Sequence, residues 1–251
     1  TLTRLTFDPA DDEEPVWSPS GKSLIFSSDR DGQDNLYWKR ADGSGQAQRL
    51  TESQNPQIPV SWHPGGRYVA FEEATPENSF DLQILALEGD DQSGWKAGDT
   101  STFVSTPFVE VDPQFSPDGD WLAYVSLESG KAEVYVRPFP GSGGKWQISS
   151  GGGGQPQWSL GGQELYFGNQ GQLFVSEYEV NGSSFAADRP VGWKEGGYYQ
   201  RAYTPSYTFH PNSQRMLVRK RVVEESHLGL DHVVLFQNFF DYLKEEVPVK
   251  E

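Results

Sequence analysis

The amino-acid sequence predicts an all-β protein that is built from repeated copies of one four-stranded unit. One short phrase occurs five times, and an apolar triplet follows each copy at a fixed distance. The 251 residues include 14% aromatic residues, 27 glycines and 17 prolines. Aromatic residues favour strands, while glycine and proline mark turns. This composition is typical of many short strands and not of a helical bundle.

The repeated phrase consists of an aromatic residue, a serine or histidine, usually a proline, a turn residue and usually a glycine. Its copies are WSPSG (17–21), WHPGG (62–66), FSPDG (115–119), WSLGG (158–162) and FHPNS (209–213). The aromatic residue is expected to end a buried inner strand, and the proline and the small polar residues are expected to form a tight turn. The five key aromatics, Trp17, Trp62, Phe115, Trp158 and Phe209, should therefore be buried between neighbouring repeats.

Each turn leads into a second strand, which begins with the triplets LIF (24–26), VAF (69–71), LAY (122–124), LYF (165–167) and MLV (216–218). Third strands are expected at NLYW (35–38), DLQI (81–84), EVYV (133–136), QLFV (172–175) and HVVL (232–235). Fourth strands are expected at QRLT (48–51), TFVS (102–105) and WQIS (146–149), with a weaker signal at PVGW (190–193).

Four short antiparallel strands that recur every 40 to 55 residues or so are typical of β-propeller blades. The sequence therefore predicts a single propeller domain over residues 1–251, with five blades near 15–51, 60–105, 113–149, 156–194 and 207–237.

The two ends of the chain suggest how this propeller closes. The fifth copy lacks a fourth strand, whereas residues 3–6 (TRLT) closely match residues 48–51 (QRLT). We expect residues 3–6 to pair with residues 232–236 and complete the last blade, which would remove an exposed sheet edge. Alternatively, residues 3–6 end a preceding blade, and the chain is a fragment of a larger propeller. The apolar spacing near the C-terminus predicts a short amphipathic helix at about 238–247.

Charge and composition limit the partners. The formal net charge is −16, from 36 acidic and 20 basic residues, so the chain should repel nucleic acid and anionic lipid. The sequence has no cysteine, which excludes disulfides and thiolate chemistry. No apolar run approaches the roughly 20 residues that span a bilayer, so direct membrane insertion is not expected. No cofactor is predicted. The first residue is Thr1, as in a processed protein or an excised piece of one.

A candidate ligand site lies where the innermost strands begin. The equivalent positions, three residues before each key aromatic, are Glu14, Pro59, Asp112, Gln155 and Ser206. They are expected to surround one face of a central channel and to form a polar pocket for a cation, an amine or a peptide end. An unoccupied hydrated channel is the alternative.

Two residues from an off-pattern aromatic segment, residues 198–203, are expected on the same face. The predicted ligand-binding residues are therefore Glu14, Asp112, Gln155, Arg201 and Tyr203. The acids would supply charge, Gln155 a neutral donor and acceptor, and Tyr203 a stacking surface.

Other polar motifs have simpler interpretations. Residues 29–34 (DRDGQD) resemble a calcium loop but lack the distal glutamate, so a turn is favoured. His63 and His210 occupy the serine position of the phrase and are expected to bond the turn backbone. His227 and His232 match no standard zinc spacing. No catalytic residue and no metal ligand is therefore assigned.

The phrase WSPxGxxLAF resembles the repeat of TolB-like propellers, which are relatives of WD-repeat propellers, over residues 1–237. Leu160 and Ser213 depart from the pattern, which leaves the blade edges open there. Three stretches are also similar to the C-terminal propellers of some bacterial serine/threonine kinases: residues 3–9, residues 133–140 with 143–147, and residues 234–241. No kinase motif is present.

This resemblance implies a non-catalytic sensing or interaction module that binds a protein, a peptide or a small polar ligand at the channel face. It would fit the sensor part of a larger receptor-kinase-like protein, and it favours an extracytoplasmic location. The alternative, by the same resemblance, is a lyase or hydrolase with acids and His227 or His232 in a channel site. A GxSxG motif is absent from the sequence. An inert scaffold is a third possibility.

Overall fold

The computed structural model describes residues 4–76, 79–141, 143–161, 163–194, 207–209 and 216–218. The chain divides into two compact units, Thr1–Lys220 and Arg221–Glu251, and the second unit lies wholly outside the described residues. Every regular element that the structure describes is a β-strand, which confirms the all-β prediction. In this part of the chain, no helix has the length and apolar character needed to cross a membrane.

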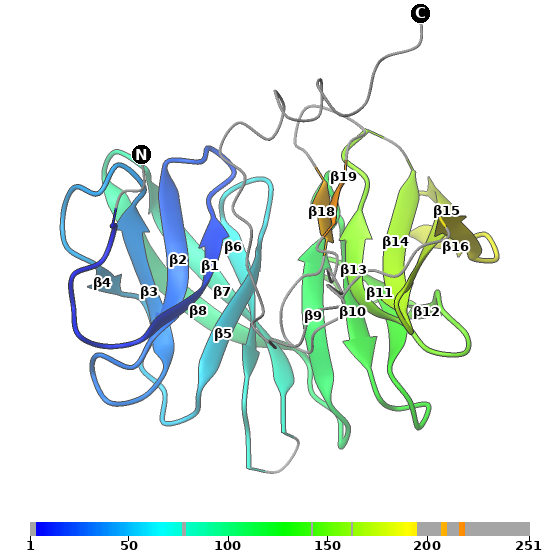
Figure 1. Ribbon diagram of the computed structural model, residues 1–251, viewed down its shortest axis with the longest axis horizontal. Helices are drawn as coiled ribbons and strands as arrows, with labels where there is room; N and C mark the ends of the chain where they lie inside the picture. The colour runs from blue at the N-terminus through cyan, green and yellow to red at the C-terminus, as the bar shows by residue number, and fades with distance from the viewer. Residues whose placement is uncertain are drawn as a thin grey trace, which may run out of the picture. The chain divides into compact units, whose positions relative to one another are not determined.

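The first three repeats each form a four-stranded antiparallel sheet whose strands follow one another in chain order (Figure 1). The first blade contains β1 (Asp12–Trp17), β2 (Ser23–Ser28), β3 (Asn35–Arg40) and β4 (Gln48–Arg49). The second contains β5 (Gln57–Trp62), β6 (Tyr68–Glu73), β7 (Asp81–Asp90) and β8 (Gly94–Val104). The third contains β9 (Glu110–Phe115), β10 (Trp121–Ser126), β11 (Glu133–Pro138) and β12 (Trp146–Gln147). The predicted strand order is confirmed in all three.

The fourth repeat has the same plan with one addition. Its strands β13 (Gly154–Trp158), β14 (Glu164–Asn169) and β15 (Gln172–Asn181) are followed by β17 (Val191–Lys194), which pairs with β15. The weak outer strand expected at 190–193 is thereby confirmed. The far half of β15 pairs instead with β16 (Ser184–Ala187), an extra hairpin that the sequence analysis missed.

The fifth repeat is described only as a hairpin, in which β18 (Tyr207–Phe209) pairs with β19 (Met216–Val218). Its predicted third strand at 232–235 and the predicted C-terminal helix at 238–247 lie outside the described residues. The five-blade count therefore stays a prediction.

Residues 3–6 were expected to form a closing strand, but the described part of this segment is not a strand. Residues 4–7 are described but irregular, and Leu5 lies near the β3–β4 loop, where a Cβ on Gly43 would be 4.0 Å from its Cδ2. A strand needs a partner edge, and the partner expected at 232–236 lies outside the described residues. The pairing itself remains untested.

The core lies between blades. One apolar cluster joins the first and second blades through Ile25, Trp38, Trp62 and Phe71, among others. Another joins the second and third through Ala70, Ile84, Phe115 and Leu122. A third joins the third and fourth through Trp121, Val136, Trp158 and Phe167, with others. Each phrase aromatic in these clusters packs against the blade that precedes it.

The burial prediction therefore holds for Trp62, Phe115 and Trp158, which are all buried, and is wrong for Trp17, which is 55% exposed. The reason is positional, because the first blade has no described blade before it. The side chain of Phe209 lies outside the described residues.

Candidate functional site

Three of the predicted site residues share an unusual backbone conformation. Glu14, Asp112 and Gln155 have φ values of 47°, 56° and 53°, in the left-handed region that residues other than glycine seldom adopt. At each of them the pairing of the inner strand with its neighbour shifts, as in a β-bulge. Bulges re-aim side chains and occur often beside functional sites.

Proline accounts for the interrupted strand pairing at these positions. Pro15, Pro113 and Pro156 each follow a bulge residue, and proline has no N–H to donate to the ladder. The residue before a proline is also discouraged from the right-handed helical region. In the second blade Pro59 itself occupies the equivalent position, and because its φ is fixed near −65° the shift falls after it, between Pro59 and Ser61.

Hydrogen bonds connect these positions from blade to blade. The inner strands are in contact in sequence, β1 with β5, β5 with β9 and β9 with β13. The backbone N–H of Gln155 donates to Asp112 Oδ2 at 3.1 Å. The backbone N–H of Asp112 donates in turn to Glu72 Oε1 at 2.7 Å. The predicted site residues of the third and fourth blades are therefore brought together, with a carboxylate from the second.

The carboxyl groups perturb one another. Burial, together with the nearby Asp112 and Glu14 carboxylates, raises the pKa of Glu72 to about 8, although the N–H of Asp112 lowers it. Burial also raises the pKa of Asp112, against the N–H of Gln155, which lowers it. The pKa of Glu14 is raised by burial and then by Glu13 and Asp112. Three acids from three blades thus lie in one region, where their ionised forms are disfavoured.

The fifth repeat reaches this region through one described residue. Tyr207, on β18, is buried, and its hydroxyl donates to the backbone oxygen of Gln155 at 2.5 Å. The remaining predicted site residues, Arg201 and Tyr203, lie outside the described residues, as does Ser206.

No family model matches the chain. A TolB homologue from Chlorobium luteolum is 30% identical over 149 residues, which is 46% of this chain and 34% of that protein. An uncharacterized peptidase, YuxL of Bacillus subtilis, is 26% identical over 138 residues, 44% of this chain and 21% of that protein. The matched region is thus about a third or less of each relative's length.

The solved structure of a puromycin hydrolase superposes on 71% of this chain and 30% of its own, with a TM-score of 0.53 and 14% identity. The chain is a TolB-like β-propeller. The narrower resemblance to kinase-associated propellers stays a prediction.

Glu72 was not predicted from the sequence, although a signal for it existed. It stands directly after the apolar triplet of the second strand, at a position where the other copies carry Ser27, Val125, Gly168 and Arg219. An acidic residue at a repeat position inside a strand that is otherwise buried is the feature that would have identified it in this TolB-like propeller.

His63 and residues 29–34 have the structural roles that were expected, whereas His210, His227 and His232 lie outside the described residues. His63 Nδ1 accepts the N–H of Gly65 at 2.9 Å, and its Nε2 lies 3.2 Å from the backbone oxygen of Gly119. Its protonation is disfavoured, because burial lowers the pKa of the ring. Residues 29–34 form a turn closed by the N–H of Gly32 and the oxygen of Asp29 at 2.7 Å. Among the described residues, no three His, Cys, Asp or Glu side chains are placed to hold a metal ion.

Proposed function

We propose that this TolB-like propeller is a non-catalytic binding module that takes a protein, a peptide or a small polar ligand at the face around Glu14, Asp112 and Gln155. By its narrower resemblance, it would serve as the sensor part of a larger receptor-kinase-like protein. The proposal rests chiefly on the shared bulge. Three equivalent positions in three blades adopt the same strained conformation, and strain of this kind clusters at ligand-binding and switch regions.

The charges of the region favour a ligand with a positively charged group, such as an amine or a peptide N-terminus. Such a group would favour the ionised forms of Glu72, Asp112 and Glu14, whose pKa values burial raises. Binding at neutral pH should therefore release a proton, mainly from Glu72.

A hydrolase or a lyase is the alternative class of function. The word peptidase in the name of one relative describes that protein, of which the match covers 21%. His227 and His232, the residues to which this alternative was tied, lie outside the described residues.

The test is a screen of the purified chain against arrays of peptides that carry a free or an acetylated N-terminus. We expect free N-termini to bind better and the double substitution Glu14→Ala with Asp112→Ala to abolish binding without unfolding the protein. Glu13→Ala is the matched control, because Glu13 neighbours Glu14 but is exposed and should bind as the wild type does. A partner that binds the double variant unchanged would place the site elsewhere.

A further inference from the structure

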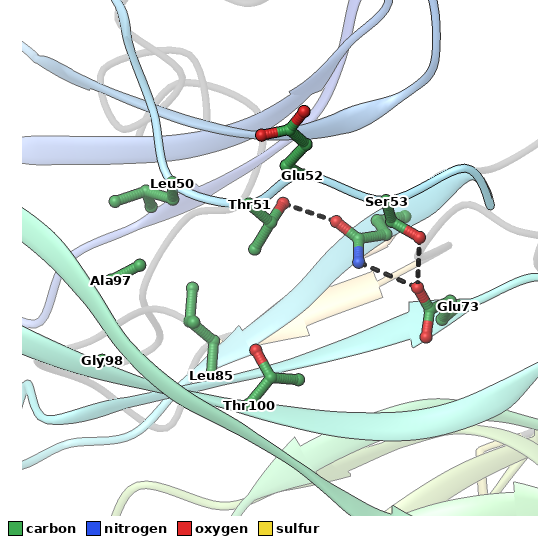
Figure 2. Close-up of a pocket in the computed structure, with 10 residues that line it drawn as sticks. Leu50, Thr51, Glu52, Ser53, Glu73, Leu85, Ala97, Gly98 and Thr100 are labelled. Atoms are coloured by element: carbon green, nitrogen blue, oxygen red, sulfur yellow. Dashed lines mark hydrogen bonds between the residues drawn. The ribbon is translucent and has the colours of Figure 1, made fainter.

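A pocket separate from this site lies at the seam of the first and second blades. It has a volume of about 290 Å³, and Figure 2 shows the residues that line it. One wall is the connection from β4 to β5, and the other comes from β6, β7 and β8. The lining residues are Leu50, Thr51, Glu52, Ser53, Gln57, Glu73, Leu85, Ala97, Gly98 and Thr100.

The pocket has two chemically different ends. Ser53, Gln57 and Glu73 form a polar end, where the Ser53 side chain points toward Glu73 (Figure 2) and the Gln57 amide is hydrogen-bonded to Glu73. Beside it lies an apolar end, where exposed Ala97 stands next to the buried side chains of Leu50 and Leu85, which are 8% and 1% exposed. A ligand that fills both ends must itself be amphipathic and short, because the volume is at the lower limit for small-molecule sites.

Hydrogen bonds fix the orientation of the polar end. The Thr51 hydroxyl accepts the N–H of Leu36 at 2.9 Å and donates to Gln57 Oε1 at 2.5 Å. The Gln57 amide must therefore turn its NH₂ group toward Glu73 Oε1, to which it donates at 3.0 Å. The Ser53 hydroxyl donates to the same oxygen at 2.7 Å.

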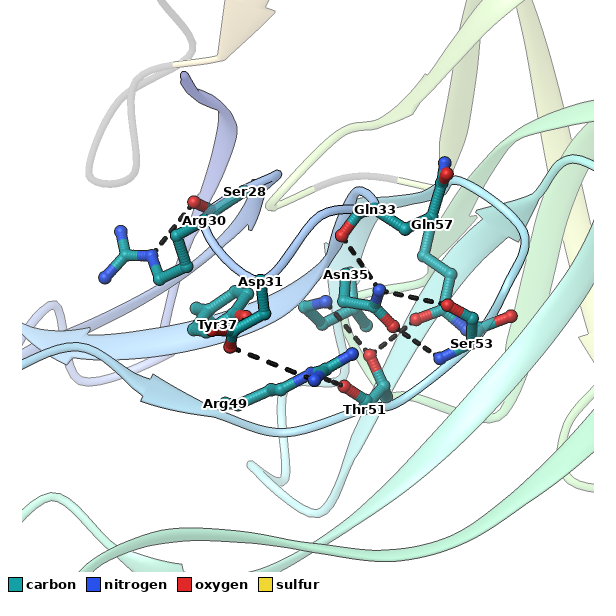
Figure 3. A network of polar contacts seen from close by, with 11 residues as sticks. Ser28, Arg30, Asp31, Gln33, Asn35, Tyr37, Arg49, Thr51, Ser53 and Gln57 are labelled. Carbon is teal, nitrogen blue, oxygen red and sulfur yellow. Dashed lines mark hydrogen bonds and ion pairs between the residues drawn. The ribbon is translucent and has the colours of Figure 1, made fainter. Parts of the chain in front are cut away.

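Two hydrogen bonds with Asn35 hold Ser53 in place. The side-chain oxygen of Asn35 accepts the backbone N–H of Ser53 at 2.6 Å, and its NH₂ donates to the backbone oxygen of Ser53 at 3.2 Å (Figure 3). Asn35 is itself fully buried at the start of β3. The polar end is therefore held in position before any ligand arrives, which reduces the entropy lost on binding.

This arrangement leaves one acceptor for a ligand. Both protein donors go to Oε1 of Glu73, and its Oε2 accepts no hydrogen bond from the described residues. The lining contains a second acid, Glu52, at its exposed rim and no lysine or arginine. The pocket therefore favours a ligand that donates hydrogen bonds and carries positive charge.

We propose that this pocket binds a primary alkylammonium group. The ammonium donates to Glu73 Oε2, and the alkyl chain lies along Leu50, Leu85 and Ala97. A free alkylamine and a lysine side chain of a partner share this chemistry. The proposal does not depend on the site around Glu14 and Asp112.

The experiment titrates the purified chain with n-butylammonium chloride and, separately, with Nα-acetyl-lysine methylamide, by isothermal calorimetry and NMR shift mapping. We expect saturable binding of n-butylammonium, with shifts centred on Glu73 and Leu85, and none by n-butanol or by sodium chloride at the same ionic strength. Equal binding of the lysine amide would point to a partner's side chain, and binding of butylammonium alone to a free amine.

Two variants test the geometry. Glu73→Gln keeps an oxygen for the donors of Ser53 and Gln57 but removes the charge, and should weaken binding by roughly tenfold or more. Ala97→Leu fills the apolar end from an exposed position and should weaken binding comparably. Glu52→Gln removes a rim charge and should change affinity by about twofold or less.

Unchanged affinity in Ala97→Leu, or an equal response to sodium chloride, would overturn the proposal. If Glu73→Gln does not fold, as judged by its melting curve, the Ala97→Leu result decides. The double variant Glu14→Ala with Asp112→Ala should bind butylammonium as the wild type does, so failure at one site is distinguishable from failure at the other.

Discussion

The carboxyl group of Glu72 lies in surroundings that are unusual for an acid. The residue is 4% exposed, and the backbone N–H of Asp112 is its only hydrogen-bond donor among the described residues. Two further carboxylates, those of Asp112 and Glu14, lie close enough to disfavour its ionisation. A buried group of this kind makes the stability of the whole domain depend on pH.

We expect Glu72→Gln to stabilise the protein in a pH-dependent manner. The pKa is raised from 4.5 to about 8 on folding, so the unfolded chain loses its proton first as the pH rises. The contribution of Glu72 is therefore fully present below the unfolded value and is lost as the pH rises toward the folded one. The gain from Gln should be small near about pH 4.5 and largest near about pH 8, as measured by urea unfolding.

Glu13→Gln serves as the control, because Glu13 is exposed and its substitution should have little effect. An equal gain from Glu72→Gln at both pH values would mean that Glu72 does not carry the raised pKa.

At the scale of strands and turns, the sequence predicts best those features whose conformation is set by neighbouring residues, such as the turns. The phrase residues form the same turn in the first three blades, with the N–H of Gly21, Gly66 and Gly119 bonded to the oxygen of the residue three before. Those glycines have φ values of 70°, 77° and 82°, which glycine adopts without strain. Outer strands are less predictable, because their length depends on the neighbouring edge and not on their own residues.

The second blade shows this limit. Its third and fourth strands were expected at 81–84 and 102–105, but they extend to Asp90 and back from Gly94 as one long hairpin. For the candidate site, the repeat spacing identified Glu14, Asp112 and Gln155 as equivalent positions but did not predict that they form bulges. It did not reveal Glu72, because only the fold brings the second strand of one blade beside the inner strand of the next.

The packing of the phrase aromatics gives a prediction at this scale. Trp62→Ala and Trp158→Ala should each cost about 3–5 kcal/mol, because both side chains are buried against the preceding blade. Trp158 also loses the bond from its indole N–H to the oxygen of Gln114 at 2.9 Å. Trp17→Ala should cost under about 1 kcal/mol if the first blade has a free edge. Urea unfolding at equilibrium measures all three.

A loss at Trp17 as large as that at Trp62 would show that a further blade covers the first one. The Trp17→Ala measurement would then show whether the first blade has a neighbour on both sides.

At the scale of the whole molecule, the predicted pairing of residues 3–6 with residues 232–236 can be tested by cross-linking. The chain has no cysteine, so an introduced pair is unambiguous. We expect Arg4→Cys with Val234→Cys to form an intramolecular disulfide under mild oxidation and to raise the melting temperature, since it would join distant parts of the chain. Mass spectrometry of the non-reduced protein detects the link.

Arg4→Cys with Lys96→Cys provides the control, because Lys96 is exposed on the hairpin of the second blade. A pair at positions 4 and 234 that links no faster than this control would refute ring closure by the N-terminal segment and would favour a longer propeller.

The left-handed conformation at Glu14 also has a consequence for how such a surface can change during evolution. Glycine adopts this conformation freely, so Glu14→Gly should raise the stability by about 1 kcal/mol or less. The equivalent positions of the third and fourth blades, Asp112 and Gln155, already hold other side chains in the same conformation. The inner rim can therefore exchange one side chain for another without redesigning the blade beneath it. In a fold of this kind, ligand specificity can change during evolution while the backbone of the blades stays the same.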